Sequence, residues 1–298
     1  MAETPAAEFR IDEPLIRALL REQAPAFADQ PLRLVASGWD NEMWMLGHEH
    51  VVRLPRRALA VESVEHEQRW LPELAPSLPV PVPVPVVAGR PTAAHPRPWS
   101  VIRWLPGSPL ADRPGSLDFA GALAGFLRAL HRPAPTDAPS NDWRGVPLVA
   151  RADRVVVGID ALADRDGTAL AERARRRWDE LVDAPAYERA PVWVHGDLHP
   201  LNLLELDGRL AAVIDFGDLT SGDPASDLAV AWMAFEPEER RHLRASLPDV
   251  DAATWARAQG WALALGALVL LNTDDDPVLE AVGRVAVARV LADESPLA

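Results

Sequence analysis

The sequence contains no cysteine and only one tyrosine, and all 30 of its basic residues are arginine because lysine is absent. Without cysteine, a disulfide framework, a thiolate metal site and a cysteine nucleophile are all excluded. Without lysine, any chemistry that elsewhere uses an ammonium group must use arginine instead or be missing. Arginine remains charged and can bind two oxygens of a phosphate at once, so it can replace lysine as a phosphate ligand.

Long hydrophobic runs are also absent. The longest apolar stretch, Trp261–Leu271, is about half of the ~20 residues that a membrane-spanning helix needs. The segment Met1–Arg10 has no apolar run behind a basic start, so it does not have the pattern of a signal peptide. We therefore expect a cytoplasmic protein with no membrane partner.

The chain has 298 residues, of which 48% are hydrophobic and 25% charged, an ordinary composition for a globular protein that is long enough for two lobes. Its net charge is −14. Nucleic-acid-binding proteins are more often basic, so we expect no nucleic-acid partner. An acidic surface attracts cationic substrates, although net charge reports on solubility first. We expect a monomer or a homodimer.

The front half of the chain predicts a helix followed by an antiparallel meander. Apolar residues at helical spacing predict one helix over Pro14–Gln23 and another over Val61–Leu74. Short apolar segments separated by turn residues predict strands at Leu32–Ala36, Met43–Leu46, Val51–Leu54 and Trp99–Leu105. The proline-rich segment Pro79–Pro85 cannot form a regular hydrogen-bond ladder, so it is expected to be extended or an edge strand.

The rear half is mainly helical, with one β-rich island at Val192–Phe216. Ser116 is a candidate helix cap, and Ala161–Val182 reads as one or two helices broken near Asp166-Gly167. Further helices are expected at Asp227–Phe235, Glu238–Ser246, Ala252–Leu271 and Pro277–Ala292. The pattern predicts an α+β fold with two lobes around a cleft, a sheet lobe over residues 1–105 and a helical lobe over residues 106–298.

Within the β-rich island, polar residues follow two apolar strands. The first segment reads His195-Gly-Asp197-Leu-His199-Pro-Leu-Asn202, and the second reads Ile214-Asp215-Phe-Gly217. Apolar strands fix such loops, and the loops present oxygen ligands. Mg²⁺ prefers oxygen, usually from one or two carboxylates together with substrate phosphates. The spacing therefore indicates a magnesium site that includes Asp or Asn side chains.

These two motifs, in this order and with this spacing, resemble the catalytic and metal loops of the aminoglycoside phosphotransferases. Those enzymes are small-molecule kinases related to the protein kinases, whose corresponding motifs are H-R-D-x-x-x-x-N and D-F-G. The resemblance covers the chain from about Leu32 to Ala234. It implies a bilobal protein-kinase-like fold and a Mg²⁺-dependent transfer of the nucleotide γ-phosphoryl group to a hydroxyl of a small molecule.

The resemblance implies a role for each motif residue. Asp197 would be the catalytic base that accepts or orients the hydroxyl proton, and Asn202 and Asp215 would hold Mg²⁺ on the nucleotide phosphates. His195 would brace the loop, and His199 reads as structural. Asp227 resembles a supporting aspartate of the same family. The alternative for these residues is a metal hydrolase, with His195, Asp197, His199 and Asp215 as direct metal ligands, but it leaves Asn202 without a role.

For the nucleotide, ATP or GTP, the resemblance implies a basic residue on a strand paired with a helix glutamate. Arg53 is the candidate in place of the usual lysine, with Arg56 and Arg57 as rivals. Glu67 is its candidate partner, with Glu62 and Glu65 as rivals. The turn Ala36–Asn41, which includes Ser37, corresponds to the phosphate-covering turn. The hinge Ile102–Leu105, with Arg103, Trp104 and Leu105, would meet the base.

The acceptor is less defined. The resemblance implies an aminoglycoside or another antibiotic, with a macrolide or a primary metabolite such as choline or homoserine as alternatives. Residues on the C-terminal helices could line its site, including Trp232, Trp255, Trp261 and the run Asp274–Asp276. A nucleotide-binding protein of the same fold without turnover is the other alternative.

Overall fold

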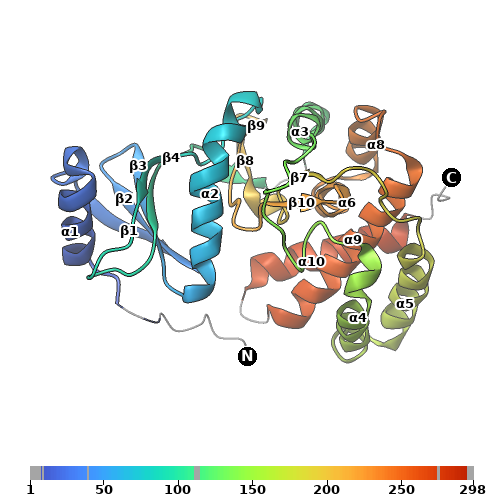
Figure 1. The fold of residues 1–298 in the computed structure, drawn as a ribbon. Helices are drawn as coiled ribbons and strands as arrows, with labels where there is room; N and C mark the ends of the chain where they lie inside the picture. Colours follow the sequence, from blue (N-terminus) through green and yellow to red (C-terminus); the bar gives the residue numbers. More distant parts are fainter. Residues whose placement is uncertain (1–7, 9, 39, 111–114, 274–275, 294–298) are drawn as a thin grey trace. The chain divides into compact units, whose positions relative to one another are not determined.

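The computed structural model describes residue 8 and residues 10–38, 40–110, 115–273 and 276–293. The described residues divide into two compact units (Figure 1). The N-terminal unit runs up to Pro106 and also includes Ile214–Gly217. The C-terminal unit comprises residues 107–213 and the chain from Asp218 onward.

The N-terminal unit contains a five-stranded antiparallel sheet in the order β1-β2-β3-β5-β4. Its strands are β1 (Leu32–Ser37), β2 (Asn41–Leu46), β3 (His50–Pro55), β4 (Pro85–Gly89) and β5 (Trp99–Arg103). The predicted meander is therefore confirmed. The proline-containing β4 is an edge strand, as expected for a residue that has no backbone N–H to donate.

Two helices cover the sheet, α1 (Glu13–Gln23) on one face and α2 (Val61–Leu74) on the other (Figure 1). Asp12 caps α1 by accepting a hydrogen bond from the Leu15 N–H at 3.1 Å. Side chains alternate along β3, so Val52 and Leu54 enter the core beneath α1. The residue between them, Arg53, consequently faces α2.

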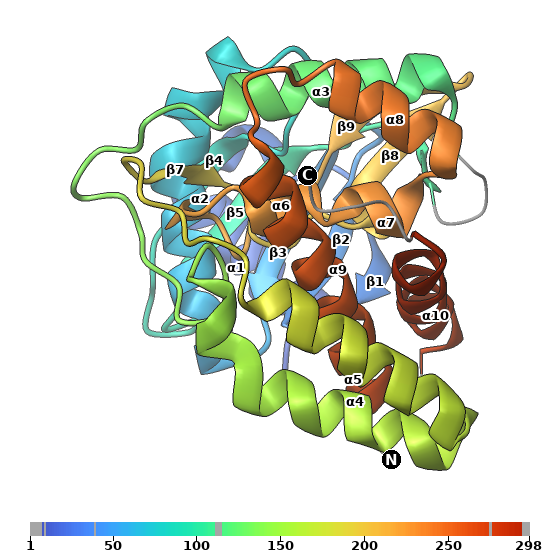
Figure 2. The ribbon, with the colours of Figure 1, turned by 90° about the vertical axis from the view of Figure 1, so that its right-hand side faces the viewer.

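The C-terminal unit is mainly helical. Its helices are α3 (Leu117–Leu130), α4 (Ala152–Asp166), α5 (Thr168–Val182), α6 (Ala225–Leu228), α7 (Val230–Ala234), α8 (Pro237–Ala245), α9 (Ala252–Asn272) and α10 (Pro277–Ala292). The apolar α9 lies at the centre and contacts α4, α5, α6, α7 and α10. Figure 2 shows α4 and α5 side by side. Ser116 caps α3, as predicted, by accepting from the Phe119 N–H at 3.2 Å.

Two helices differ from the sequence prediction. The helix predicted over Asp227–Phe235 is instead two short helices, α6 and α7. The other difference lies in the segment predicted over Ala161–Val182. The expected break near Asp166-Gly167 is present because Gly167 adopts φ +97°, which separates α4 from α5. However, α4 begins at Ala152, well before the predicted start at Ala161. A 3₁₀ turn, Leu148–Arg151, leads directly into it. The run Asp153–Val157, polar at first and then rich in β-branched valine, conceals the helical pattern there.

Short strands in the C-terminal unit hold the motif loop. Strand β7 (Val192–Val194) pairs with β10 (Thr220–Gly222), and β8 (Leu203–Leu206) pairs with β9 (Arg209–Val213) and the short β6 (Ser108–Pro109). The loop between β7 and β8 carries the His195–Asn202 motif, so both of its ends are anchored in buried strands.

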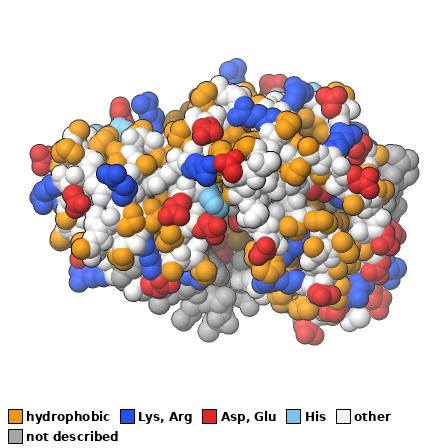
Figure 3. All heavy atoms as spheres, in the orientation of Figure 1, with side chains coloured by type: hydrophobic (Ala, Val, Ile, Leu, Met, Phe, Trp, Pro, Cys, Tyr) orange, Lys and Arg blue, Asp and Glu red, His pale blue; other side chains and the backbone are white. Residues whose placement is uncertain are grey.

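Within the described residues, no helix is long and apolar enough to cross a membrane. Acidic and basic side chains are interspersed over the face shown in Figure 3. Although the chain has a net charge of −14, the charged side chains on that face do not form a patch of one sign.

Candidate functional site

The loop after β7 is held by Asp227, a buried residue of α6. One carboxylate oxygen of Asp227 accepts the His195 N–H at 2.8 Å and the other accepts the Gly196 N–H at 2.9 Å. His131 Nε2 lies 3.0 Å from the first of these oxygens. Because both carboxylate oxygens are used, Asp227 fixes the loop backbone immediately before Asp197.

Gly196 permits the sharp turn at this point. Its φ is +88°, and a Cβ at this position would lie 2.3 Å from the backbone oxygen of Asp218. Only glycine adopts this conformation and tolerates such a close approach. The glycine in the motif is therefore needed for the path of the backbone.

The motif residues Asp197, His199 and Asn202 converge within this loop. The amide nitrogen of Asn202 donates to the backbone oxygen of Asp197 at 2.8 Å and lies 3.5 Å from its carboxylate oxygen Oδ2. His199 Nε2 lies 3.3 Å from the same Oδ2. Since His199 Nδ1 accepts the Leu201 N–H, the proton of a neutral imidazole is on Nε2 and is donated to Asp197. His199 therefore contacts the candidate base directly.

Arg144 is a site residue that the sequence analysis missed. Its Nη2 lies 3.3 Å from Asp197 Oδ1 and 3.7 Å from Asp218 Oδ2. Burial on its own raises the pKa of Asp197, but His199, Arg144 and His195 lower it by more. The pKa of Asp197 is therefore well below its usual range, and its carboxylate is ionised. Arg144 lies 53 residues before Asp197 in an irregular loop, and no sequence pattern links the two.

In the N-terminal unit, Arg53 and Glu67 form a buried ion pair. Arg53 Nη1 donates to Glu67 Oε2 at 2.5 Å, and the two side chains are only 9% and 5% exposed. Arg53 Nη2 lies 3.6 Å from Asp215 Oδ1. Burial lowers the pKa of Arg53, but the carboxylates of Glu67 and Asp215 raise it by more, so the guanidinium remains charged. The structure thus brings together three predicted site residues.

Asp215 has an unusual backbone conformation. Its φ is +61°, in the left-handed region that non-glycine residues rarely adopt, although aspartate tolerates it better than most. Its carboxylate is 54% exposed and remains accessible to a ligand. A strained, accessible carboxylate beside a buried arginine is a pattern that points to a functional site.

The rival residues have other roles. Arg57 Nη1 lies 3.3 Å from Asp40, and Arg56 Nη1 donates to the Gly38 backbone oxygen, so both hold the Ala36–Asn41 turn rather than Glu67. The glutamates Glu62 and Glu65 are exposed, whereas Glu67 is buried.

The remaining predicted nucleotide residues lie at strand ends. Ser37 ends β1 and is exposed, and Arg103 ends β5 with an exposed side chain. The Trp104 N–H donates to the Glu49 backbone oxygen at 2.7 Å, and its side chain is 43% exposed. Leu105 is half-buried.

The predicted acceptor residues fall into two groups. Trp232, Trp255 and Trp261 are buried, so they belong to the core of the C-terminal unit. Asp274 and Asp275 lie outside the described residues, whereas Asp276 caps α10 by accepting from Val278 and Leu279.

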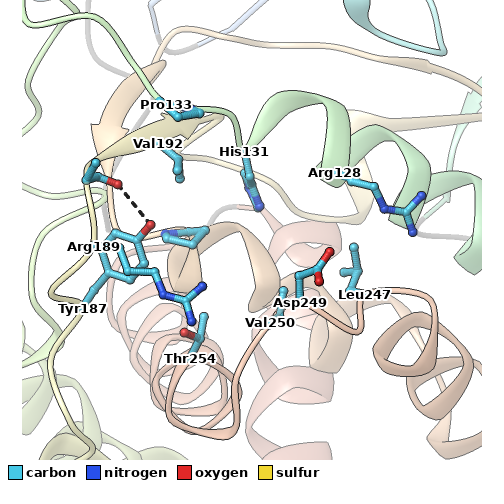
Figure 4. A pocket seen from close by; sticks show the side chains of 12 residues that line it. Arg128, His131, Pro133, Tyr187, Arg189, Val192, Leu247, Asp249, Val250 and Thr254 are labelled. Atoms are coloured by element: carbon cyan, nitrogen blue, oxygen red, sulfur yellow. Dashed lines mark hydrogen bonds between the residues drawn. The ribbon is translucent and has the colours of Figure 1, made fainter.

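A pocket of about 370 Å³ lies elsewhere in the C-terminal unit (Figure 4). It is lined by residues that include His131, Tyr187, Val192, Asp249 and Thr254. None of the predicted site residues lines it. One of its lining residues, His131, contacts Asp227, which holds the motif loop.

Two observations bear on a metal ion. Among the described residues, no group of three or more histidine, aspartate or glutamate side chains is arranged to hold one. The amide nitrogen of Asn202 donates to Asp197, which leaves its amide oxygen to accept a cation. In the N-terminal unit, the carboxylate of Asp215 is exposed. Each of the two residues, taken in its own unit, thus offers an oxygen of the kind that Mg²⁺ prefers.

Comparison with known proteins identifies the family. Residues 31–261 match the model of APH, the phosphotransferase enzyme family. An uncharacterized protein YcbJ of Bacillus subtilis is 26% identical over 82% of this chain and 83% of its own length. An Escherichia coli aminoglycoside 3'-phosphotransferase is 31% identical, over 44% of this chain and 49% of its own length.

Solved structures agree in fold. The GDP and kanamycin complex of an APH(2") enzyme has a TM-score of 0.68 at 20% identity and covers 94% of this chain and 99% of its own. Macrolide 2'-phosphotransferase MphH from Brachybacterium faecium has a TM-score of 0.61 at 24% identity and covers 90% and 97%. The predicted kinase-like fold is confirmed. Since the family model spans most of the chain, the protein belongs to the APH phosphotransferase enzyme family and is a small-molecule phosphotransferase.

Proposed function

We propose that the protein is a Mg²⁺-dependent kinase that transfers the γ-phosphoryl group of a nucleoside triphosphate to a hydroxyl group of a small molecule, with Asp197 as the catalytic base. The supporting observation is the environment of Asp197. Its backbone is fixed through Asp227, and its carboxylate is kept ionised by His199 and Arg144. A fixed carboxylate suits a reaction in which positioning supplies most of the rate.

In the proposed reaction the acceptor oxygen bonds to the γ-phosphorus as the bond from that phosphorus to the β,γ-bridging oxygen breaks. The nucleoside diphosphate leaves with that electron pair, and the hydroxyl proton passes to a carboxylate oxygen of Asp197. His199 donates to Oδ2 and Arg144 to Oδ1, so the two neighbours hold the carboxylate plane in one orientation. Asp197 can then point a lone pair at the acceptor hydroxyl.

Asn202 and Asp215 are the proposed metal-binding residues. When bound, Mg²⁺ would neutralise charge on the β- and γ-phosphates. The assignment of both residues to one cation rests on the order and spacing of their two motifs. The contacts within each unit support it separately, because they leave the Asn202 amide oxygen and the Asp215 carboxylate available.

We assign nucleotide binding to the N-terminal unit and the acceptor to the C-terminal unit. Glu67 orients Arg53, whose guanidinium would contact the nucleotide phosphates in place of a lysine. Ser37 would donate to a phosphate from the turn after β1, and the segment Arg103, Trp104 and Leu105 would meet the base. Structures of the relatives contain GDP, ATP or ADP, so both ATP and GTP are candidate donors.

Among the relatives, named activities include aminoglycoside, viomycin and macrolide phosphotransferases. An aminoglycoside or another antibiotic is therefore the acceptor class to test first. A primary metabolite, such as choline or homoserine, and a nucleotide-binding protein without turnover remain the alternatives.

The test measures nucleoside diphosphate release with MgATP or MgGTP and a panel of these acceptors. Asp197→Asn keeps the shape of the side chain but removes the base, so we expect turnover to fall by about 10²- to 10⁴-fold while nucleotide affinity is retained. Asp164→Asn is the matched control, because Asp164 is an exposed α4 residue. Near-native turnover by the Asp197 variant would show that another group is the base. Nucleotide binding without turnover of any acceptor would favour the alternative of a binding protein.

A further inference from the structure

Four residues of the C-terminal unit form an arginine–tryptophan cluster, which comprises Trp143, Arg144, Arg151 and Arg154. The guanidinium carbons of Arg151 and Arg154 lie 4.7 Å and 5.2 Å from the Trp143 ring centroid. Trp143 itself is 50% exposed. The cluster therefore presents cationic groups around one partly exposed aromatic ring.

Arg151 is buried without an anionic partner. It is only 4% exposed, and its Nε is enclosed without a hydrogen-bond partner. Within the part of the chain that the structure describes, its side chain makes no hydrogen bond or ion pair. Arg144 Nε is also enclosed without a partner. Asp142 and Asp153 adjoin the cluster in sequence but are exposed, and neither pairs with it among the described residues. Buried charges usually have partners, so these donors indicate a missing anion.

The local electrostatics agree with this reading. Burial lowers the pKa of Arg151, and the like charges of Arg144 and Arg154 lower it further. Arg151 is also the N-cap residue of α4, so the positive end of that helix dipole adds to the same potential. Three arginines are therefore close together here in a chain whose net charge is −14.

The cluster adjoins the proposed catalytic base. Arg144 bonds Asp197 and is held there by a loop fastened on both sides. The Ser221 N–H donates to the Pro139 oxygen at 3.0 Å, and the Asp223 N–H donates to the Gly145 oxygen at 2.8 Å. Within the loop, Asn141 donates to Asp218 at 2.8 Å. The loop is therefore built to hold its arginine beside Asp197.

We propose that the arginine–tryptophan cluster is an acceptor subsite that binds an oxyanion, either a carboxylate or a phosphate, carried by the molecule whose hydroxyl faces Asp197. This inference rests on the proposed function and names the substrate class more closely. The anion would pair with Arg151 and Arg154, and an adjoining apolar or aromatic part of the acceptor would lie against Trp143. Aminoglycosides carry several ammonium groups, so the cluster would repel them.

Calorimetry on the intact protein tests the binding step without nucleotide. Phenyl phosphate, benzoate and benzylamine share a ring and differ in charge. We expect an anion to bind, and Arg151→Gln and Arg154→Gln each to weaken it by about tenfold or more, the usual effect of losing a charge-assisted hydrogen bond. Arg154 is exposed, so its variant tests the proposal even if Arg151→Gln does not fold. Arg176→Gln, an exposed α5 residue with the same change in charge, should have no effect.

The outcomes separate the two anion sources. Binding of phenyl phosphate alone identifies a phosphate, and binding of benzoate alone identifies a carboxylate. Three results would overturn the proposal. They are the absence of anion binding, anion binding that is equal in all variants, and benzylamine binding as tight as that of the anions.

Turnover then separates this inference from the proposed function. Acceptors with an anionic group should show a raised KM and a nearly unchanged kcat in Arg154→Gln, because the proposed contact binds the acceptor and does not touch the reacting atoms. Wild-type turnover confined to kanamycin would overturn the subsite. If no acceptor is phosphorylated by the wild type, the proposed function fails, while the calorimetry still decides whether the anion site exists.

Discussion

Removing Arg53 should separate its part in folding from its part in nucleotide binding. Arg53→Met keeps an unbranched side chain of similar length but leaves Glu67, which is 4% exposed, without its guanidinium partner. Breaking one side of a buried ion pair costs about 3–5 kcal/mol, because the remaining charge stays buried. We therefore expect the N-terminal unit to lose about this much free energy of unfolding.

The double variant Arg53→Met/Glu67→Leu removes both charges. Replacing a buried pair with apolar residues of similar volume is often neutral, so most of the lost stability should return. Nucleotide affinity should not return, because the group proposed to contact the phosphates is still missing. Chemical denaturation gives the first quantity, and calorimetric titration with MgATP gives the second.

A matched change in the C-terminal unit controls for general destabilisation. Arg257 forms a buried pair with Asp223, with its Nε 2.7 Å from one carboxylate oxygen and its Nη2 3.2 Å from the other. Arg257→Met should cost similar stability without changing the affinity for nucleotide at a temperature where the protein is folded. If the Arg53/Glu67 double variant binds MgATP as tightly as the wild type, then Arg53 has only a structural role.

Two further predictions concern burial and backbone strain. His95 is fully buried, and burial together with the charge of Arg97 lowers its pKa to about 4. As the pH falls, His95 is therefore protonated in the unfolded chain before it is protonated in the folded protein. The free energy of unfolding should therefore drop by about 2 kcal/mol between pH 7 and pH 5. Urea unfolding should show a smaller drop for His95→Asn than for the wild type. An equal drop in both proteins would show that His95 is not the cause. At Gly196, where φ is +88°, Gly196→Ala places a Cβ 2.3 Å from the Asp218 backbone oxygen. The variant should therefore lose at least about 2 kcal/mol of unfolding free energy and have a reduced kcat. Wild-type unfolding and turnover would contradict this prediction.

Much of the N-terminal unit could be predicted because its signals are local. The helix Val61–Leu74 matches the prediction at both ends, and the strands follow from short apolar segments between turn residues. Helical periodicity could also have selected the partner of Arg53. Val64, Glu67, Leu71 and Leu74 are buried on one face of α2, whereas its other glutamates are exposed. The prediction had left that choice open.

The motif residues were predictable for a different reason. A short loop between two buried strands has few possible paths, so Asp197, His199 and Asn202 must lie close together. The roles of His199 and Arg144 needed coordinates. His199 was read as structural, yet it donates to Asp197, and the tautomer that permits this depends on one backbone N–H. Arg144 comes from a segment without periodicity and reaches Asp197 through tertiary contacts alone.

Charge is the clearest case in which a global property does not determine a local one. A net charge of −14 suggested cationic substrates, but an acceptor beside Asp197 would experience the nearest charges most strongly, because surface charges beyond about 10 Å are screened by salt. The nearest basic groups include Arg144, which contacts Asp197, and Arg151, which is buried without an anion. The residues that touch the acceptor, rather than the sum over the chain, therefore decide whether a cation or an anion binds.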